Sequence, residues 1–583
     1  MLKQNRLTGL LALAVFLPMS VTAAAPPAGT DLKPYTPVTD QRLSQPEPQN
    51  WLMYRANYES WGYSPLKKIT TDNVKNLKLA WSYSTGMMDG HQSPPIVNNG
   101  YMYVTTPNNQ VIAFEAKTGK ELWRYKKQIP EELQQLHPTN RGVALYGDKV
   151  YIATTDAFVV ALDAVTGKEL WKTASADWKA GYYATLAPLA AEGKIMIGVS
   201  GGEYGIRGFV AAYDAETGKE VWKRYTIPAP GEAGSETWPK DDTWKTGGGS
   251  VWVTGSYDSN TKVSYWGVGN AAPWMPDTRP GDNLYSSSVM GIDVNTGELK
   301  GHHQYHQGDG WDWDEVSAPM LIDIERNGKK VKSLVHAGRN GYMWWLERSK
   351  NKIGFVDAWP FVLQNVFESV DKKTGRPTYV KARIPATGKT VNFCPSLWGG
   401  KDWPPEAYNP NTGLVYVPAN NNLCAEITGT AAGKYKPGSL YIGVGLDNIL
   451  THVRLDEAAK KGIGEVQAWD MKTGKKVWTH VFPQMNWGPL LTTAGNLVFG
   501  GGTNDRKFRA FDARDGKLVW EQAMSSGVTG VPTSFEVDGE QFIAVQSGWG
   551  IDAQRMQGAF DAVMSTKTLV PQGGVVNVFR LEQ

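Results

Sequence analysis

The chain has 583 residues, a length that corresponds to about four domains of ~150 residues each. Its 60 Lys and Arg nearly balance its 57 Asp and Glu, with no concentrated basic run, which excludes a typical nucleic-acid-binding protein. Only two cysteines exclude a disulfide-dense scaffold and an all-cysteine zinc site, and 63 Gly with 34 Pro argue against a helical protein.

The N-terminal segment, residues 1–25, has the layout of a secretory signal peptide. Lys3 and Arg6 precede an apolar run over residues 10–17, and small residues follow where we expect cleavage. A short membrane anchor is the alternative, but Pro18 ends the apolar run well short of the ~20 residues that a span needs. No cysteine near the cleavage site marks a lipoprotein.

We therefore expect an exported, periplasmic protein whose mature chain covers residues 26–583. Removal of Lys3 and Arg6 lowers the formal charge from +3 to +1. No later segment is long and apolar enough to cross a bilayer. Export also permits a disulfide between Cys394 and Cys424.

One phrase recurs along the chain and accounts for several of its 24 tryptophans. Residues 113–123 read Ala-Phe-Glu-Ala-Lys-Thr-Gly-Lys-Glu-Leu-Trp, and near-copies occupy residues 161–171 and 212–222. Two further copies end at Trp478 and Trp520. Looser, partial or worn copies are expected at residues 291–300, residues 407–416, residues 344–348 and Trp81.

The phrase predicts a β-hairpin, because alternating apolar residues form a strand, Asp-x-x-Thr-Gly makes the turn, and the tryptophan lies on the return strand. Trp123 follows Trp81 by 42 residues and Trp171 follows Trp123 by 48, which leaves room for about four short strands per unit. We expect each tryptophan to lie flat between neighbouring units, with its N–H bonded to a backbone carbonyl.

With seven or eight such units, the sequence predicts an all-β fold, a single eight-bladed β-propeller with Trp-docking repeats, in place of four separate domains. A stack of unrelated β-sandwiches is the alternative interpretation of the same strands.

Several motifs resemble reactive sites without the context that those sites need. Residues 198–202 (Gly-Val-Ser-Gly-Gly) fit a nucleophile elbow, but a strand-like run follows where a helix is required. His302 and His306 are spaced like zinc ligands on a helix, yet their segment follows a hairpin turn, so we expect solvated loop histidines. Residues 443–445 (Gly-Val-Gly) lack a third glycine, and the sequence contains neither a phosphate-binding Walker loop nor a Cys-x-x-Cys-His haem motif.

Five ordered segments between the repeats are too specific for a scaffold. They are residues 139–145 (Thr-Asn-Arg-Gly-Val-Ala-Leu), 200–208 (Ser-Gly-Gly-Glu-Tyr-Gly-Ile-Arg-Gly), 247–252 (Gly-Gly-Gly-Ser-Val-Trp), 267–274 (Gly-Val-Gly-Asn-Ala-Ala-Pro-Trp) and 311–314 (Trp-Asp-Trp-Asp). Together with the repeated phrase they resemble the pyrroloquinoline-quinone (PQQ) dependent alcohol dehydrogenase family, the methanol and ethanol dehydrogenase group. The resemblance implies an eight-bladed propeller with PQQ and a metal ion on its central axis.

The resemblance implies a role for each matching residue. Glu203, Asn270 and Asp312 resemble the metal ligands, and Asp312 also resembles the catalytic base that takes the proton of the alcohol. Trp252 resembles the indole floor stacked on the quinone, and Arg339 resembles the catalytic arginine near the reactive quinone oxygens. The other positions that resemble cofactor contacts are Arg141, Thr185, Ser200, Gly201, Gly202, Ser250, Asn421 and Trp487.

The chemistry of the cofactor agrees with this residue set. PQQ is a flat, polyanionic quinone, so it needs an aromatic platform, donors for its carboxylates, and a Lewis acid at its carbonyl. A carboxylate beside it can remove the hydroxyl proton as hydride leaves the alcohol carbon. Taken singly, Glu203 and Asn270 fit turns, Trp252 fits a core and Asp312 fits a solvated position. Their shared order favours the site.

Asp314 departs from the calcium-type members, which usually carry a small or neutral residue there, and it resembles the lanthanide-dependent branch. Residues two apart on a strand face the same side, so Asp312 and Asp314 can reach one ion. With Glu203 they supply three negative charges, which suit a trivalent hard cation. We expect a lanthanide ion, with Ca²⁺ as the alternative; a second interpretation leaves Asp314 behind the ligands or facing solvent.

The cysteines match the family only in part. Cys394 and Cys424 resemble a cross-blade disulfide of the family, whereas the adjacent cysteine pair that members place over the quinone is absent. The matching positions are Gln135 and Leu136, followed by His137 and a proline. We therefore expect a different and roomier cover over PQQ. Another departure is Gln92, which stands where a glutamate that contacts the cofactor is common.

The resemblance favours a periplasmic PQQ-dependent dehydrogenase that oxidises an alcohol to an aldehyde or ketone. Without a haem motif of its own, it is expected to pass electrons to an external acceptor, a soluble cytochrome c. A non-catalytic propeller scaffold is one alternative, but it has no need of Glu203, Asn270, Asp312 and Trp252 in this order. A PQQ-dependent sugar dehydrogenase is another, disfavoured by the Asn-Arg-Gly and Asp-x-Asp contexts.

Overall fold

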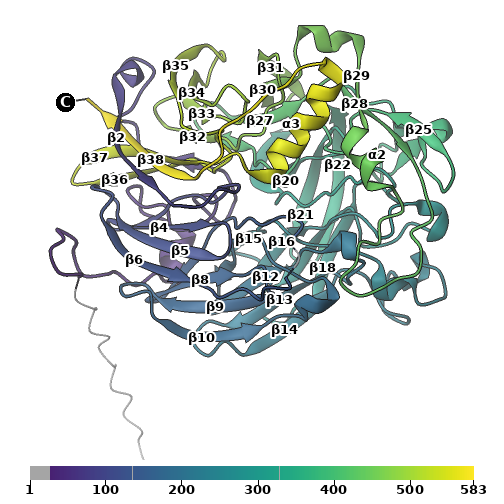
Figure 1. Ribbon diagram of the computed structural model, residues 1–583, viewed down its shortest axis with the longest axis horizontal. Coiled ribbons are helices and arrows are strands. Elements are labelled where there is room, and N and C mark those ends of the chain that lie inside the picture. The colour runs from purple at the N-terminus through teal and green to yellow at the C-terminus, as the bar shows by residue number, and fades with distance from the viewer. Residues whose placement is uncertain (1–25, 134, 327, 583) are drawn as a thin grey trace, which may run out of the picture.

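A computed structural model describes residues 26–133, 135–326 and 328–582, so the predicted signal peptide lies outside the described residues. Within these ranges the chain forms eight sheets of four or five strands, one sheet of three strands and one of two. Figure 1 shows the large sheets following one another around the molecule in chain order. The predicted all-β fold is confirmed.

Each of the first five large sheets is built from four strands that follow one another in the chain. Their strands are β3 (Ile96–Asn98), β4 (Tyr101–Thr106), β5 (Gln110–Glu115), β6 (Glu121–Lys126); β7 (Ala144–Tyr146), β8 (Lys149–Ala153), β9 (Phe158–Asp163), β10 (Glu169–Ala174); β11 (Leu189–Ala191), β12 (Lys194–Gly198), β13 (Phe209–Asp214), β14 (Glu220–Tyr225); β15 (Ser256–Asp258), β16 (Val263–Gly267), β17 (Ser288–Asp293), β18 (Leu299–Gln304); and β19 (Met320–Arg326), β20 (Lys329–Ala337), β21 (Tyr342–Ser349), β22 (Lys352–Pro360).

The other three large sheets include strands that are distant in the chain. They are β26 (Ala407–Asn409), β27 (Leu414–Asn420), β30 (Gly464–Asp470), β31 (Lys475–Phe482); β1 (Tyr63–Ser64), β32 (Leu491–Thr493), β33 (Leu497–Gly500), β34 (Lys507–Asp512), β35 (Leu518–Ala523); and β2 (Leu77–Ser84), β38 (Val575–Leu581), β37 (Glu540–Ser547), β36 (Thr533–Val537). The small sheets are β23 (Phe367–Val370) with β24 (Pro377–Tyr379), and β25 (Thr390–Phe393) with β28 (Leu423–Thr428) and β29 (Val453–Leu455).

Helices are few and short in the described residues. The α-helices are α1 (Asp40–Ser44), α2 (Leu446–Thr451) and α3 (Gly550–Met564). The 3-10 helices are η1 (Val74–Asn76), η2 (Trp178–Ala180), η3 (Gly202–Tyr204), η4 (Ser235–Thr237), η5 (Thr243–Thr246), η6 (Pro276–Thr278), η7 (Lys381–Arg383) and η8 (Glu457–Lys461). None of the helices in the described residues is long and apolar enough to cross a membrane.

The repeated phrase forms the hairpin between the third and fourth strands of a sheet, and its tryptophan contacts the next sheet. Trp123 Nε1 donates to the carbonyl of Ala164 at 3.1 Å, and Trp171 Nε1 donates to that of Ala215 at 3.1 Å. Trp81, Trp222, Trp478 and Trp520 make the same kind of bond. The predicted indole-to-carbonyl contact between units is therefore confirmed.

The turn glycine of the phrase lies directly under the indole of the preceding sheet. Gly119 has φ +76°, and a Cβ added there would lie 2.6 Å from Cδ2 of Trp81. Gly119→Ala should therefore lower the free energy of unfolding by about 2–5 kcal/mol, because left-handed strain adds to overpacking. Urea denaturation of the variant and the wild type measures the loss.

The matched control for this glycine is Gly193→Ala. Gly193 has φ +71°, and an added Cβ would meet nothing within 4 Å. This change should cost only the backbone strain of about 1–2 kcal/mol. Equal losses for the two variants would show that contact with the indole of Trp81 is not what requires glycine in the phrase.

The looser copies differ from one another in the structure. Residues 291–300 form the β17–β18 hairpin, and the carbonyl of Val294 accepts from Trp222 Nε1, so this copy is complete except for its own tryptophan. Residues 407–416 form a hairpin between first and second strands, β26 and β27, which is a different place in the sheet. Residues 344–348 lie inside β21 and contain no turn. These last two are not structural copies of the phrase.

The N-terminal and C-terminal parts of the described chain meet in one sheet. β2 pairs with β38 in an antiparallel register that places Leu77 opposite Leu581. Trp520 Nε1 donates to the carbonyl of Leu77 at 3.2 Å, which links this sheet to the preceding one. The first long strand therefore completes the sheet of the last three, as the purple and yellow strands of Figure 1 show.

The predicted disulfide between Cys394 and Cys424 is confirmed. Its position differs from the one that the resemblance implies. β25 pairs with β28 so that Phe393 is opposite Ala425, and the two cysteines follow at the end of this ladder. The disulfide therefore joins neighbouring strands of one small sheet and not two large sheets.

Candidate active site

The predicted site residues lie in segments that the topology brings to one end of the sheets. Because the first two strands of each sheet are antiparallel, the segment that enters the first strand lies beside the segment that leaves the second. Segments that enter first strands carry Arg141, Thr185, Ser250, Trp252, Asp312, Asp314 and Trp487. Segments that leave second strands carry Ser200, Gly201, Gly202, Glu203, Asn270, Arg339 and Asn421.

Backbone hydrogen bonds join these segments to one another. Arg141 N donates to Thr185 O at 2.8 Å, Val251 N donates to Val199 O at 2.7 Å, and Gly269 N donates to Ser250 O at 2.7 Å. Each segment is thus held by its neighbour and by the strand that it enters or leaves. Side chains on such rigid, mutually bonded segments are well placed to hold a ligand.

A cavity of about 370 Å³ opens among these segments. It is lined by eleven of the predicted site residues: Arg141, Thr185, Ser200, Gly201, Glu203, Ser250, Trp252, Asp312, Asp314, Arg339 and Trp487. The sequence spreads them over nearly 350 positions, from 141 to 487. The structure therefore brings most of the predicted set together in one place.

Asp314 connects the acidic residues to the aromatic wall. Its Oδ2 accepts from Trp252 Nε1 at 2.7 Å, and its Oδ1 accepts from the backbone N–H of Asn270 at 2.6 Å. An added Cβ at Gly269 would overlap Oδ1 of Asp314, so only glycine fits beside this carboxylate. Asp314 is buried, which excludes the solvent-facing interpretation of this residue.

Burial and the repulsion between like charges raise the free energy of the ionised forms of Asp312 and Asp314 when no cation is bound beside them. Burial raises the pKa of Asp314 to about 7; Arg339 opposes the rise, and Glu203 adds to it. Burial also raises the pKa of Asp312 well above its usual range, again against Arg339 and with Asp314 and Glu203 contributing. A cation among these carboxylates removes both costs.

The side-chain amide of Asn270 lies between the carboxylate of Asp314 and the indole of Trp274. It lies 2.8 Å from Asp314 Oδ1 and 3.0 Å from Trp274 Nε1. With its nitrogen toward Asp314, both contacts are hydrogen bonds; with its oxygen toward Asp314, it adds an oxygen ligand to the carboxylates. In the described residues, no three His, Cys, Asp or Glu side chains are yet close enough to enclose an ion.

Arg339 fixes the position of Asp312. Its NH1 donates to the backbone carbonyl of Asp312 at 2.7 Å and lies 3.8 Å from the carboxylate Oδ2 of the same residue. Its NH2 donates to Asp402, which is also buried. Burial lowers the pKa of Arg339, but Asp402, Asp312 and Asp314 together raise it, so the guanidinium remains a cation at all accessible pH values.

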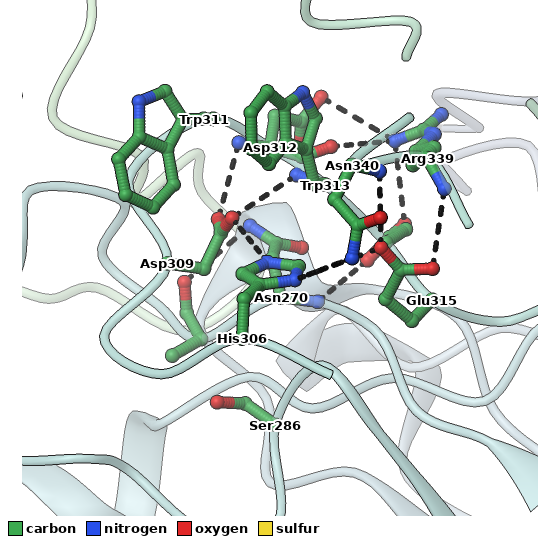
Figure 2. A network of polar contacts seen from close by, with 12 residues as sticks. Asn270, Ser286, His306, Asp309, Trp311, Asp312, Trp313, Glu315, Arg339 and Asn340 are labelled. Atoms are coloured by element: carbon green, nitrogen blue, oxygen red, sulfur yellow. Dashed lines mark hydrogen bonds and ion pairs between the residues drawn. The ribbon is translucent and has the colours of Figure 1, made fainter. Parts of the chain in front are cut away.

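Two buried carboxylates that sequence reasoning missed hold the loops that carry Asp312 and Arg339 (Figure 2). Asp309 accepts from the backbone N–H of Asp312 at 3.1 Å and from that of Trp313 at 3.3 Å. Glu315 accepts from the backbone N–H of Arg339 at 3.1 Å. The pair thus sets the backbone of both the predicted base and the predicted arginine.

His306 lies between these carboxylates. Its Nε2 is 2.9 Å from Asp309 Oδ1, and its Nδ1 is 3.3 Å from Asn340 Nδ2. It is fully buried, so its prediction as a solvated loop histidine is wrong, whereas His302 is exposed on β18. His306 follows the end of that strand, and the aromatic residues after it close the loop over its ring.

The opposite part of the cavity offers hydrogen-bond donors. Arg141 NH1 donates to Thr185 Oγ1 at 2.6 Å, and Thr185 Oγ1 lies 3.2 Å from Ser200 Oγ. The guanidinium of Arg141 also lies 4.8 Å from the ring centroid of Trp252. Among the described residues that line the cavity, Nε of Arg141, Nε of Arg339 and Nε1 of Trp487 are buried donors without a partner. Such orphan donors fit an acceptor-rich ligand, as PQQ is.

Comparison with known proteins decides the family. The family described as "PQQ: Glucose/ethanol/alcohol dehydrogenase, beta-propeller domain" matches residues 51–353 and 480–543. The quinoprotein alcohol dehydrogenase PedH of Pseudomonas putida is 38% identical over 539 residues, which cover 88% of each chain. The chain belongs to the PQQ-dependent alcohol dehydrogenases.

Other relatives of this dehydrogenase differ in what their names state. The quinoprotein ethanol dehydrogenase of Pseudomonas aeruginosa is 37% identical and covers 91% of this chain and 90% of its own. The lanthanide-dependent methanol dehydrogenase of Methylacidiphilum fumariolicum is 37% identical and covers 86% and 85%. A solved structure, a europium-containing methanol dehydrogenase, superposes with a TM-score of 0.85 at 34% identity and covers 93% of this chain and all of its own.

Some predicted residues of the dehydrogenase lie off the cavity. Gly202 and Asn270 are directly behind lining residues, since an added Cβ at Gly202 would lie 3.3 Å from Ser250 Oγ and 4.0 Å from Asn270 Oδ1. Asn421 bonds the backbone N–H of Leu363 at 2.8 Å and does not line the cavity, so its cofactor role stays a prediction. Gln92 is buried away from the cavity lining.

The positions that match the absent cysteine pair form part of the cavity wall. Leu136 and His137 line the cavity, and His137 Nδ1 lies 2.9 Å from Asp552 Oδ1 on α3. Arg555 NH1, also on α3, donates to the carbonyl of Leu136 at 3.3 Å. An ion pair from His137 to α3 therefore lies beside Gln135 and Leu136, the positions at which the resemblance implies a cysteine pair.

The His137–Asp552 pair makes the attachment of α3 sensitive to pH. Burial lowers the pKa of His137, but the carboxylate of Asp552 outweighs burial, so the pKa of His137 lies above 6.5. Glu203 adds to this rise and Arg141 opposes it. The ion pair therefore stabilises the attachment of α3 fully below about pH 6.5. This stabilisation is lost as the pH rises through the higher pKa that His137 has in the folded protein. Hydrogen exchange at the N-terminal turn of α3, corrected for intrinsic rates, should therefore show more frequent opening at pH 9 than at pH 6.

The control for this prediction is His137→Gln, which keeps a polar side chain but does not titrate. Opening of α3 in this variant should be the same at pH 6 and pH 9. In the wild type, burial raises the pKa of Asp552 and His137 lowers it more, so His137 is the member of the pair that titrates over this range. An identical pH dependence in the variant and the wild type contradicts a role for His137.

Proposed function

We propose that the dehydrogenase oxidises an alcohol to an aldehyde or ketone at this cavity, with PQQ and a lanthanide ion as cofactors and Asp312 as the base. The observation that carries the proposal is the convergence of Glu203, Asp312, Asp314, Arg339 and Trp252 on one cavity. We further infer that the eight large sheets are the eight blades of a single propeller domain over residues 26–583.

The residues present fit both cofactors. Trp252 offers a flat wall held by Asp314, and Arg141, Thr185, Ser200 and Ser250 offer donors to an anionic ligand. The side-chain oxygens of Asp314 and Asn270, which are buried, and of Glu203 and Asp312, which are half-buried, suit a hard cation. When bound, PQQ would supply the quinone that takes up a hydride, and with it both electrons, from the alcohol, and the cation would supply a Lewis acid beside it.

The chain itself handles the proton. Asp312 is held from both sides of its backbone, by Asp309 at its N–H and by Arg339 at its carbonyl, while its side chain faces the cavity. Burial strengthens its affinity for a proton. The carboxylate therefore accepts the hydroxyl proton of the alcohol, and Arg339 beside it keeps the ionised form available before the reaction.

The three carboxylates of Glu203, Asp312 and Asp314 favour a trivalent ion over Ca²⁺, because charge is the main difference between these hard cations. Each oxygen of Asp314 has one hydrogen-bond donor and a second lone pair for an ion. The names of two relatives, lanthanide-dependent and europium-containing, agree with this choice. Ca²⁺ is the alternative.

Reconstitution tests the proposal. Purified apoprotein is loaded with PQQ and either La³⁺ or Ca²⁺, then assayed with an artificial electron acceptor over a panel of alcohols. We expect dye reduction with La³⁺ and less or none with Ca²⁺. If neither ion supports dye reduction with any alcohol, the proposed enzymatic function is contradicted. If Ca²⁺ supports it and La³⁺ does not, the proposed lanthanide cofactor is contradicted.

We also propose a periplasmic location and a soluble cytochrome c as electron acceptor. The support is the signal-peptide layout of residues 1–25 and the lack of a Cys-x-x-Cys-His motif in the sequence. N-terminal sequencing of the protein from a periplasmic fraction should begin near residue 26. Reduction of added cytochrome c by the loaded enzyme and alcohol tests the acceptor.

A further inference from the structure

The loop between β18 and β19 carries Asp312 in a backbone conformation that its neighbours have to hold. Asp312 has φ +61°, in the left-handed region that residues other than glycine adopt at a cost. Its N–H donates to Asp309 Oδ2 at 3.1 Å, and its carbonyl accepts from Arg339 NH1 at 2.7 Å. The direction in which the side chain of the proposed base leaves the backbone therefore depends on these two partners.

His306 is the side-chain partner of Asp309. Its Nε2 lies 2.9 Å from Asp309 Oδ1, and both side chains are fully buried (Figure 2). His306 does not line the cavity, so it is not placed to touch the alcohol or PQQ. It can affect the reaction through the residues that it holds.

The amide of Asn340 determines which ring nitrogen of His306 carries the proton. Asn340 Oδ1 accepts from Tyr342 N at 3.0 Å and from Trp344 Nε1 at 3.2 Å, two groups that can only donate. Asn340 Nδ2 therefore faces His306 Nδ1, at 3.3 Å, and donates to it. Because Nδ1 accepts, the proton of the imidazole is on Nε2, from which it is donated to Asp309.

An imidazolium ion between two carboxylates is the alternative, and the geometry disfavours it. Glu315 Oε1 lies 3.6 Å from His306 Nδ1, which is longer than a hydrogen bond. A proton on Nδ1 would also face the amide N–H of Asn340. Glu315 instead accepts from the backbone N–H groups of Arg339 and Asn340, each at 3.1 Å. This carboxylate thus holds the loop of Arg339 and not the imidazole.

The hydrogen bonds form a closed ring (Figure 2). Arg339 donates to the carbonyl of Asp312, Asp312 donates to Asp309, His306 donates to the same carboxylate, and Asn340 donates to His306. Asn340 follows Arg339 in the chain, which completes the ring. Its two ends keep Arg339 NH1 3.8 Å from Asp312 Oδ2. His306 joins the two loops on the side away from the cavity.

We propose that His306 is a positioning residue for the oxidation. As the neutral tautomer with its proton on Nε2, it orients Asp309 and, through Asp309, the backbone N–H and the side chain of Asp312. This proposal rests on the proposed function, because it adds a residue to the machinery of the same cavity. The imidazole acts through the directions of its two hydrogen bonds and contributes no charge.

The first test does not depend on turnover. The wild-type protein, loaded with PQQ and La³⁺, is prepared with ¹⁵N-labelled histidine, and the ring signals that are missing in His306→Gln identify His306 among the eight histidines. At pH 7 these signals should show a protonated Nε2 and an unprotonated Nδ1. A proton on Nδ1, in the other tautomer or in an imidazolium ion, overturns the proposal whether or not the protein oxidises alcohols.

The second test uses two variants that each keep one of the hydrogen bonds. In His306→Gln the amide nitrogen takes the place of Nε2 and can donate to Asp309, whereas in His306→Asn the amide oxygen takes the place of Nδ1 and leaves Asp309 without its donor. We expect His306→Gln to keep kcat within about threefold of the wild type. His306→Asn should lower kcat by about 10- to 100-fold with little change in KM, as a displaced reacting group does.

These rates are expressed per molecule that contains PQQ and metal, so a loss of cofactor is not counted as a loss of kcat. A role in folding alone predicts the same kcat for both variants once they are folded and loaded. Equal kcat in the two variants, or a larger loss in His306→Gln, overturns the proposal. If His306→Asn does not fold, the tautomer in the wild-type protein decides.

The third measurement reports the position of the base directly. The N–H groups of Asp312 and Trp313 both donate to Asp309, so their hydrogen exchange should be at least tenfold faster in His306→Asn than in His306→Gln. Equal exchange overturns the proposal. If the loaded wild type oxidises no alcohol but the exchange rates differ as expected, the proposed function fails while the control of Asp312 by His306 is supported.

The matched control is His302→Asn. His302 is exposed on β18, four residues before His306, and does not line the cavity. This variant should keep the wild-type kcat and the wild-type exchange of Asp312. A loss of kcat equal to that of His306→Asn would overturn the assignment to His306.

Discussion

Asp312→Asn should lower kcat of the loaded dehydrogenase by about 10²- to 10⁴-fold, the contribution typical of a positioned general base. The asparagine keeps the size of the side chain but has no proton affinity in the accessible pH range. Asp312 has φ +61°, a conformation in which asparagine is well tolerated, so the variant should fold. Steady-state rates with a saturating alcohol and an artificial acceptor measure the loss.

Two controls accompany Asp312→Asn. Asp357→Asn replaces a partly exposed aspartate on β22 that does not line the cavity, and it should leave kcat unchanged. PQQ and metal content of Asp312→Asn show whether the cofactors are still bound. Full occupancy with less than a tenfold loss of kcat would falsify the assignment of Asp312 as base.

Asp314→Asn should weaken lanthanide binding at least about 100-fold, because even residues that only orient metal ligands contribute about 10- to 100-fold. The change removes one of three negative charges but keeps a side-chain oxygen for one of its two donors, the N–H of Asn270 or Nε1 of Trp252. Terbium luminescence, sensitised by the tryptophans of the cavity, measures the affinity directly. La³⁺-dependent activity should fall with it.

Asp314→Ala extends this test. It removes the charge and also leaves the N–H of Asn270 and Nε1 of Trp252 without their partner, which costs about 1–3 kcal/mol for each buried group. It should lose La³⁺-dependent activity and some stability, whereas Asp314→Asn loses mainly affinity. Asp323→Ala, on β19 and away from the cavity, is the control. Unchanged terbium affinity in both Asp314 variants contradicts a metal role.

The repeated phrase made the strands predictable from sequence. Its alternating apolar residues, its Thr-Gly turn and its tryptophan are local signals, and each is explained by a contact in the structure, such as that between Trp81 and Gly119. The site residues were predictable only through the resemblance, because Glu203 and Asp312 lie far apart in sequence and each alone fits an ordinary turn or surface position. The antiparallel topology is what brings them together.

The features of the site that could not be predicted from the sequence depend on tertiary packing. Asp309 and Glu315 accept from backbone N–H groups, and His306 contacts the side chains of Asp309 and Asn340. An acidic or histidine residue in a loop normally indicates solvent. A signal was present for Asp309, since it lies next to the tryptophan-rich residues 311–313, where a solvated loop is unexpected. α3 had a clearer signal: Ala553, Gln557 and Phe560 are buried at helical spacing.

The pairing of β2 with β38 constrains how the protein is made. The strand that contains Leu77 leaves the ribosome early, but its partner around Leu581 is among the last residues synthesised. During synthesis β2 therefore remains without its partner strand, and an unpaired strand of this kind associates with other chains. This topology requires that the strand be shielded until β38 has been made, and a truncation that removes β38 leaves β2 without its partner in an otherwise intact chain.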